Sequence, residues 1–385
     1  GLPGQETVLV QPAAMTPLKN LREVTFGSAG QTIAASFVRR RLASMGASVA
    51  AFHVNSAIGS TAIAKHIPGT PPHSNGGFAL GIFSVISHFC GIRPEGSFLA
   101  FNQGDGDSTA LNDTSYADWL ARLLSIHDAR TSAWTMIQDW AEKRFGTRPR
   151  DHWTLLCQFA KAGTDFDVAE AMMAASLDGT RKIRIAAPDY IFKTSYQRYL
   201  EDPSTGLNLP SDDHHGARDM LFKGAYYERM AAQIAAGNTA ANILHPVTVT
   251  RVGAVVTVNW NTTAPNLTMP LQLRNDLVPN HSDGNYGFSY WVGGKKGAGG
   301  VKQTISVPPA VNGSNQVAFT LASVPGGGEE WLGIGVDPEA PGDKIGPHAG
   351  APRCNLCDST TATATEDGET MTLRNYSAIG WWQKS

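Results

Sequence analysis

The chain has 385 residues, of which 42% are hydrophobic, and its formal net charge is −2. This length exceeds one ordinary domain and the composition is sufficient for real cores, so we expect two domains. The small net charge excludes a global basic field for holding nucleic acid. The longest apolar run, at 78–91, is too short and too interrupted to cross a bilayer, so we expect a soluble chain without membrane insertion.

The first 243 residues alternate predicted helices with predicted strands. In 33–45 the apolar positions recur with a helical period, and three arginines lie mostly on the other side. The expected helices are 33–45, 78–91, 116–145 (as one long or two short helices), 169–175 and 219–235, and the expected strands are 47–54, 97–101, 153–159 and 182–186. This alternation predicts an α/β domain with a parallel sheet covered by helices on both faces.

The composition changes near residue 244, where short alternating strands separated by Gly, Asn and Pro turns begin. The expected strands are 247–251, 254–260, 303–307, 316–321 and 331–336. This pattern predicts a smaller all-β sandwich of Ig-like size. We therefore expect an α/β domain over 1–243 and a β-sandwich domain over 244–385. The second is either a structural or oligomerising appendage, or it binds glycans through aromatic side chains such as Trp260, Tyr290 and Trp291.

Polar residues end the predicted strand at 97–101. The apolar run stops abruptly at Asn102 and Gln103 and continues as Gly-Asp-Gly-Asp, which is typical of a buried parallel strand whose carboxyl end opens into a site. Far downstream, Asp212 precedes His215 by three residues, a spacing that lets a carboxylate orient an imidazole as a general base. Together these two segments predict an ester-cleaving hydrolase.

Four segments, taken in chain order, resemble the blocks of the SGNH (GDSL-like) hydrolases. They are Ile58-Gly-Ser-Thr-Ala-Ile63, Gln103-Gly-Asp-Gly-Asp107, Ala187-Pro-Asp-Tyr190, and Asp212-x-x-His215 followed by Gly224-Ala-Tyr-Tyr227. The likeness is greatest to the sialate O-acetylesterase-like and carbohydrate-esterase branch, whose third block usually has Glu where this chain has Asp105. The resemblance implies a three-layer SGNH-like fold, and the β-rich remainder resembles the C-terminal module of some bacterial and phage members.

The resemblance also implies roles for four residues. In that family a serine attacks an ester, hydrogen-bond donors hold the oxyanion, and an Asp-x-x-His pair activates the serine. By position, Asp212 orients, His215 is the base, and Gly59 (backbone N–H) and Gln103 (side-chain amide) hold the oxyanion. This chemistry needs no metal and no other cofactor.

Alternatives for these residues stay open. Gly59 also fits a simple tight turn, and the segment at Gln103 fits a helix-capping loop. The downstream loop fits a solvated polar loop. It also fits a metal cluster formed by Asp212, Asp213, His214 and His215, which would indicate a metal-dependent hydrolase.

The family's nucleophile block, Gly-Asp-Ser or Gly-Gln-Ser after a strongly apolar strand, is not visible in this sequence. Ser28 is the candidate nucleophile because Gly27-Ser28 follows a weak predicted strand at 23–26. The first strand of that fold is central, and its loss would leave two rows of unpaired backbone groups. Either 23–26 or 7–10 forms it, or a segment upstream of Gly1 supplies both strand and serine, or the serine is lost.

The working hypothesis is a serine esterase that removes acyl groups, foremost acetyl, from a carbohydrate. Its expected partner is an acylated glycan or polysaccharide, its expected location is extracellular or virion-associated, and it could form a homo-oligomer or a virion component. The alternative is a catalytically inactive SGNH-like scaffold that serves as a glycan-binding or virion or cell-surface structural protein. The sequence upstream of Gly1 would discriminate between the two.

Four cysteines are too few for a fold built on disulfides. Cys90 and Cys157 lie in apolar runs, whereas Cys354 and Cys357 lie in a C-terminal loop. This last pair, without clustered histidines, is weak evidence for zinc. We expect a local disulfide or two free thiols there.

Overall fold

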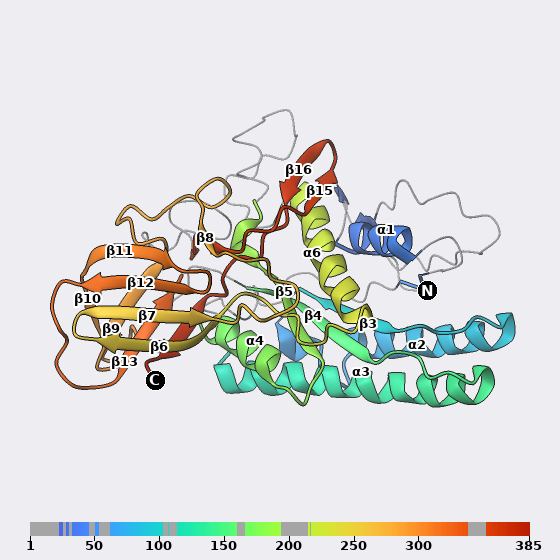
Figure 1. Ribbon diagram of the computed structural model, residues 1–385. Coiled ribbons are helices and arrows are strands. Elements are labelled where there is room, and N and C mark those ends of the chain that lie inside the picture. The colour runs from blue at the N-terminus through green and yellow to red at the C-terminus, as the bar shows by residue number, and fades with distance from the viewer. Residues whose placement is uncertain are drawn as a thin grey trace.

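The computed structural model describes residues 23–25, 28–30, 33–45, 51–53, 62–102, 107, 114–159, 166–193, 215, 217–337 and 352–385. Figure 1 shows a part rich in long helices, followed along the chain by a part built from antiparallel strands. The predicted order, an α/β region before a β region, is confirmed at this level.

Three parallel strands form the sheet of the α/β region. β3 (Ser97–Phe101), β4 (His152–Gln158) and β5 (Ile183–Pro188) lie side by side in that order. All seven residues of β4 are buried, as expected for a central strand covered on both faces. The three strands predicted between residues 97 and 188 are confirmed, with shifts of one or two residues at their ends.

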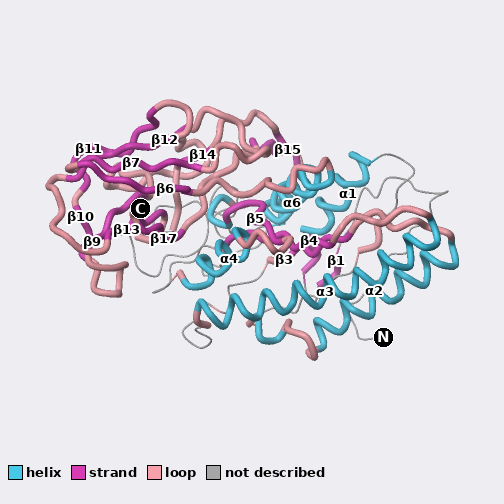
Figure 2. Tube along the Cα trace, turned by 60° about the horizontal axis from the view of Figure 1, so that its bottom comes forward, coloured by secondary structure: helices cyan, strands magenta, loops and turns pink. Residues whose placement is uncertain are grey.

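Helices cover both faces of this sheet, as Figure 2 shows. α1 (Ile33–Met45) packs on α6 (Ala217–Ala235), which contacts β4 and β5. On the other face, α3 (Tyr116–Phe145) and α4 (Asp167–Leu177) pack together and contact β4. α2 (Pro71–Cys90) lies beside α3.

Local signals explain the ends of the two longest helices. Ser115 caps α3 by accepting a hydrogen bond from the Asp118 N–H, and Gly146 ends it with a positive φ of 73°. α2 begins with Pro71 in the first turn, seven residues earlier than we expected. The apolar run alone, at 78–91, does not mark this start, because the first turn of α2 is polar and begins at a proline.

The amino-terminal region differs from the expectation. β1 (Glu23–Thr25) and β2 (Ser28–Gly30) form an antiparallel two-stranded sheet of their own. The hypothesis that 23–26 supplies a strand of the parallel sheet is therefore wrong for its described part, because 23–25 pairs locally with the next three-residue strand. Residues 7–10 and most of the predicted strand at 47–54 lie outside the described residues, and 51–53 has no regular structure.

The β region contains two four-stranded antiparallel sheets. Their strand orders are β10-β9-β13-β17 and β11-β12-β7-β6. The bounds are β6 (Pro246–Val252), β7 (Val255–Trp260), β9 (Phe288–Val292), β10 (Val301–Gln303), β11 (Ile305–Asn312), β12 (Gln316–Leu321), β13 (Glu330–Ile334) and β17 (Gly380–Gln383). Phe319 of the second sheet meets Phe288 and Tyr290 of the first, each at 6.2 Å between ring centroids.

Three aromatic side chains proposed above as a glycan platform are part of this core. Trp260, Tyr290 and Trp291 are 3%, 0% and 7% exposed. β9 is an inner strand covered on both faces, so Tyr290 faces Phe319 while the Trp291 ring lies 5.9 Å from that of Trp381. The glycan role suggested for these three residues is therefore wrong.

The segment between β13 and β17 contacts the α/β region. Two short antiparallel pairs also form, between β8 (Gln272–Leu273) and β14 (Leu356–Cys357) and between β15 (Thr363–Glu366) and β16 (Glu369–Thr372). Glu366 accepts hydrogen bonds from Ser36 (2.7 Å) and Arg40 on α1, and Tyr190 donates to the Ser377 carbonyl at 2.8 Å. One apolar cluster runs through both regions. None of the described helices has the length and apolarity needed to cross a membrane.

Candidate functional site

Asp189 occupies the carboxyl end of β5. It opens a single 3-10 turn (η2, Asp189–Ile191) and is only 3% exposed. Its Oδ2 lies 2.8 Å from Nε2 of His215, and its Oδ1 contacts the Lys223 ammonium and lies 3.4 Å from the Cys157 Sγ. This carboxylate therefore joins side chains from β4, β5, α6 and the segment that precedes α6.

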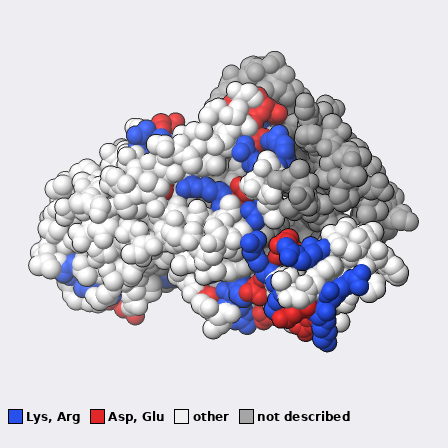
Figure 3. Space-filling view, turned by 45° about the vertical axis from the view of Figure 1, so that its right-hand side comes forward, with Lys and Arg blue, Asp and Glu red and all other residues white. Residues whose placement is uncertain are grey.

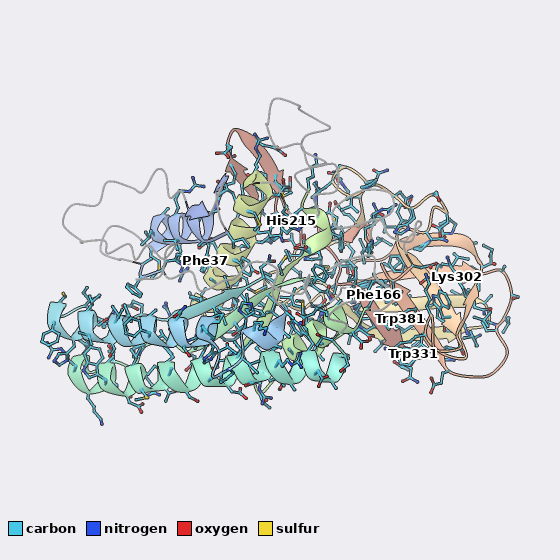
Figure 4. All side chains as sticks on the ribbon, turned by 180° about the vertical axis from the view of Figure 1, so that it is seen from behind. Phe37, Phe166, His215, Lys302, Trp331 and Trp381 are labelled. Carbon is cyan, nitrogen blue, oxygen red and sulfur yellow. The ribbon has the colours of Figure 1, made fainter. Side chains whose placement is uncertain are left out.

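His215 lies just before α6 and is labelled in Figure 4. Its side chain is 6% exposed, and its ring meets that of Phe192 edge-on at 6.1 Å between centroids. Nδ1 lies 3.4 Å from the Lys193 carbonyl oxygen. Both ring nitrogens thus face an oxygen acceptor, and the contact of Nε2 with Asp189 is the shorter of the two.

Lys223 ties the site to the rest of the sheet edge. It lies two turns into α6 and is 1% exposed. Besides Asp189, its Nζ donates to Oδ1 of Asn102 at 3.3 Å and lies 5.4 Å from the centre of the Phe192 ring. Asn102 directly follows β3, so the carboxyl ends of the three parallel strands converge here, where open α/β sheets usually bind ligands.

The charges around Asp189 keep it ionised. Burial by itself raises the pKa of this carboxyl, but the charges of His215 and Lys223 and their hydrogen bonds outweigh burial and hold the pKa well below its usual range. Burial, together with the charge of Asp189, raises the pKa of the Cys157 thiol well above its ordinary value. Cys157 is therefore a neutral thiol and a poor nucleophile.

A carboxylate that holds an imidazole is half of a general-base arrangement. With Nε2–H donating to Asp189, Nδ1 is the nitrogen left to accept a proton. His215 is thus the predicted base, whereas Asp189 is a site residue that the sequence pattern did not predict. The available signal was the Ala187-Pro-Asp-Tyr190 block, which places an acid directly after an apolar strand.

The other predicted site residues are not brought together by the described structure. Asp212, Gly59 and Gln103 lie outside the described residues, as do Asp213 and His214. Ser28 lies in β2, where only the backbone is described. Within the described ranges, no group of three or more His, Cys, Asp or Glu side chains is placed to hold a metal ion. The roles assigned to these residues stay predictions.

The C-terminal cysteines are free thiols. Cys354 and Cys357 are fully buried, and burial raises the pKa of each to about 12. The sequence left open a local disulfide or two free thiols, and the structure has two free thiols.

Comparisons with known proteins find no family model and no curated protein that matches this sequence. Among solved structures, a carbohydrate acetylesterase from Xanthomonas citri matches at 11% identity, with 74% of this chain and 49% of that chain covered and a TM-score of 0.40. An S-layer protein matches at 11% identity over 76% of this chain and 40% of that one, with a TM-score of 0.19. This chain spans less than half of the length of each of these two solved proteins. Both TM-scores are too low to bear on the fold or the activity of this chain.

Proposed function

We propose that this protein is a serine esterase that removes acyl groups, foremost acetyl groups, from a glycan. The observation that carries the proposal is the 2.8 Å contact between Asp189 and His215 at the carboxyl edge of the parallel sheet. An oriented imidazole in that position is what activation of a serine hydroxyl requires. The SGNH-like order of the sequence blocks supports the same reaction.

In this proposal His215 takes the serine proton while Asp189 keeps the imidazole in place. Asp212 is the rival orienting carboxylate, and the two can be told apart. If Asp189 orients through Nε2, the serine meets Nδ1, whereas orientation by Asp212 through Nδ1 requires Nε2 to leave Asp189. Gly59 and Gln103 are the proposed oxyanion donors, and the nucleophile is Ser28 or a serine upstream of Gly1.

The proposal assigns the chemistry to residues 1–243, as an SGNH-like domain, and treats 244–385 as an accessory β-sandwich domain. An extracellular or virion-associated location, with an acylated polysaccharide as partner, fits this activity. Both regions share one apolar cluster, so the accessory domain also supports the fold of the first.

A catalytically inactive scaffold is the second candidate function. It is favoured by the closed network at Asp189, in which His215 contacts an oxygen acceptor through each nitrogen and Lys223 already balances the carboxylate. A buried network of this kind also stabilises a fold without any chemistry.

Hydrolysis of 4-nitrophenyl acetate by the purified full-length protein, with any sequence upstream of Gly1 included, tests the two candidates. For an esterase, His215→Ala should lower the rate by roughly 10³-fold or more, because the serine loses its base. His88→Ala, which removes an exposed imidazole on α2, controls for uncatalysed attack by surface histidines and should leave the rate unchanged. Comparison of Asp189→Asn with Asp212→Asn identifies the orienting carboxylate, and Ser28→Ala tests the nucleophile.

The same assay has a clear negative outcome. If the intact protein hydrolyses neither the aryl ester nor acetylated polysaccharides above the rate of its His215→Ala variant, the esterase proposal fails and the scaffold remains. Activity that survives Ser28→Ala removes Ser28 alone from the mechanism.

A further inference from the structure

A cavity of about 1020 Å³ lies at the amino end of the parallel sheet, the edge opposite His215. Its walls come from α1, α2 and α3 and from the starts of β3 and β4, including Ser97 and His152. Seven Lys and Arg side chains line it. Four of them form ion pairs with carboxylates, namely Arg41, Arg93, Arg181 and Lys182. On the face shown in Figure 3, more Lys, Arg, Asp and Glu side chains gather on the helical part of the molecule than on the β region.

Arg130 is the buried cation of this cavity. It projects from α3 toward Gly76 of α2, where an added Cβ would lie 2.3 Å from its Nη2 atom. Nη2 donates to the His73 carbonyl at 2.5 Å, while Nη1 is buried and has no hydrogen-bond partner among the described residues. Arg130 is 7% exposed, and no carboxylate of the described residues acts on its charge.

A buried guanidinium without a counter-ion costs free energy, because its hydration is lost and not replaced. Burial accordingly lowers the pKa of Arg130. Two nearby histidines are neutral, since burial lowers the pKa of His73 to about 4 and that of His152 to about 3, and an imidazole offers no negative charge in either form. Each of these imidazoles also has a buried Nε2 without a partner. The local chemistry is thus short of a negative group.

Aromatic side chains lie beside this cation. Trp134 follows Arg130 by one helical turn, so the two side chains share a face of α3. The Trp134 ring stacks on Phe83 of α2 at 6.3 Å between centroids and 22° between planes, and Phe83 lies 5.6 Å from Phe52. All three rings line the same cavity. It therefore offers a cationic group next to a continuous apolar wall.

We propose that this cavity binds an amphipathic anion, with a carboxylate or phosphate head on Arg130 and an apolar body along Phe83 and Trp134. An arginine with a free N–H is the side chain best suited to either head group. The cavity volume is at the upper end of the range for small-molecule sites. The site is separate from the Asp189–His215 pair, so it stands or falls independently of the esterase activity.

Isothermal titration of the whole chain with four probes tests the proposal. Decanoate and decyl phosphate carry both parts of the ligand, 1-decanol carries only the apolar part, and inorganic phosphate carries only the head. We expect at least one of the two amphipathic anions to bind, and to bind at least tenfold more tightly than decanol or phosphate. The stronger of the two identifies the head group.

Variants then assign the head to Arg130. Arg130→Met should weaken binding of the preferred anion by roughly 10- to 100-fold, the value of a charge-assisted hydrogen bond, and leave decanol binding unchanged. Arg144→Met is the matched control, because Arg144 lies on the same helix, is exposed and does not line the cavity. It should leave all four titrations unchanged.

Three results would overturn the proposal. They are failure of both amphipathic anions to bind at 1 mM, equal binding of decanol and the anions to the wild type, and anion binding that survives Arg130→Met. If Arg130→Met does not fold, as judged by circular dichroism, the wild-type comparison of decanoate, decyl phosphate and decanol still decides between an anion site and a merely apolar one.

Discussion

The side chain of Gln158 pairs with the backbone of Ile379 as a neighbouring strand would. Its amide donates to the Ile379 carbonyl at 2.8 Å, and its Oε1 accepts from the Ile379 N–H at 2.9 Å. Gln158 ends β4 of the parallel sheet, whereas Ile379 directly precedes β17 of the β region. Both residues are fully buried, so this pair joins the two regions of the chain within their shared core.

Replacement of Gln158 by Met should therefore destabilise the whole protein. The volume is similar, but the N–H and C=O of Ile379 lose their partners, at a cost of roughly 1–3 kcal/mol for each group. We expect urea unfolding to remain a single transition with a lower midpoint. Gln303→Met, whose amide contacts only the backbone of its own strand β10, is the control and should change stability by less than about 0.5 kcal/mol. Independent melting of the two regions in the wild type would contradict this coupling.

The Asp189–Lys223 contact should be visible as energetic coupling. Asp189→Asn leaves the ammonium of Lys223 buried without a charge partner, which typically costs about 3–5 kcal/mol. Lys223→Met leaves Asp189 with His215 and the Cys157 thiol. The double variant should lose less stability than the sum of the single variants, because it buries no unpaired charge. Additive losses in urea unfolding would show that the two groups do not interact.

Stability should fall in acid in part because of Glu330. The Arg251 guanidinium, at 2.6 and 2.8 Å, together with Lys384 and Tyr290, lowers the pKa of this carboxyl to about 2. Because an unfolded Glu titrates near about 4.3, the contribution of Glu330 is complete above that pH and is lost as the pH falls toward 2.

Glu330→Gln should therefore be less stable than the wild type at pH 7, and the difference should shrink between pH 4 and pH 2. Urea unfolding at a series of pH values measures it. Glu329→Gln, a neighbouring exposed residue, is the control and should follow the wild-type pH profile. A constant difference across the whole range would show that the ion pair is not responsible.

Two glycine-to-alanine variants should change the stability of the protein in opposite directions. A Cβ on Gly224 of α6 would lie 2.4 Å from the Ile33 carbonyl oxygen and 2.7 Å from the Ser36 Cβ, so Gly224→Ala must push α1 away. We expect a loss of roughly 1–3 kcal/mol. Gly81→Ala on α2 meets no atom within 4 Å and should gain up to about 1 kcal/mol from helix propensity. Thermal unfolding of both variants checks the α1–α6 contact. Equal shifts of the two melting temperatures would contradict it.

Local patterns were enough to predict much of the α/β region. Helix 33–45, strand 97–101 and helix 116–145 have the predicted bounds, because a helical period, a short apolar run and capping residues act through neighbours in the chain. β9 was missed, since Phe288-Ser-Tyr-Trp-Val292 has little alternation when both of its faces are covered.

The candidate site was also predicted only in part from the sequence. The sequence by itself singled out His215, because a histidine three residues after an acid is a local pattern. Only the tertiary structure decided that Asp189 contacts His215 and that Lys223 balances the carboxylate. It also decided that Arg130 is buried with no carboxylate partner among the described residues, and that Trp260 and Tyr290 are core residues. The physical reason is that conformation is set by adjacent residues, whereas burial and charge pairing depend on which distant segments the fold brings together.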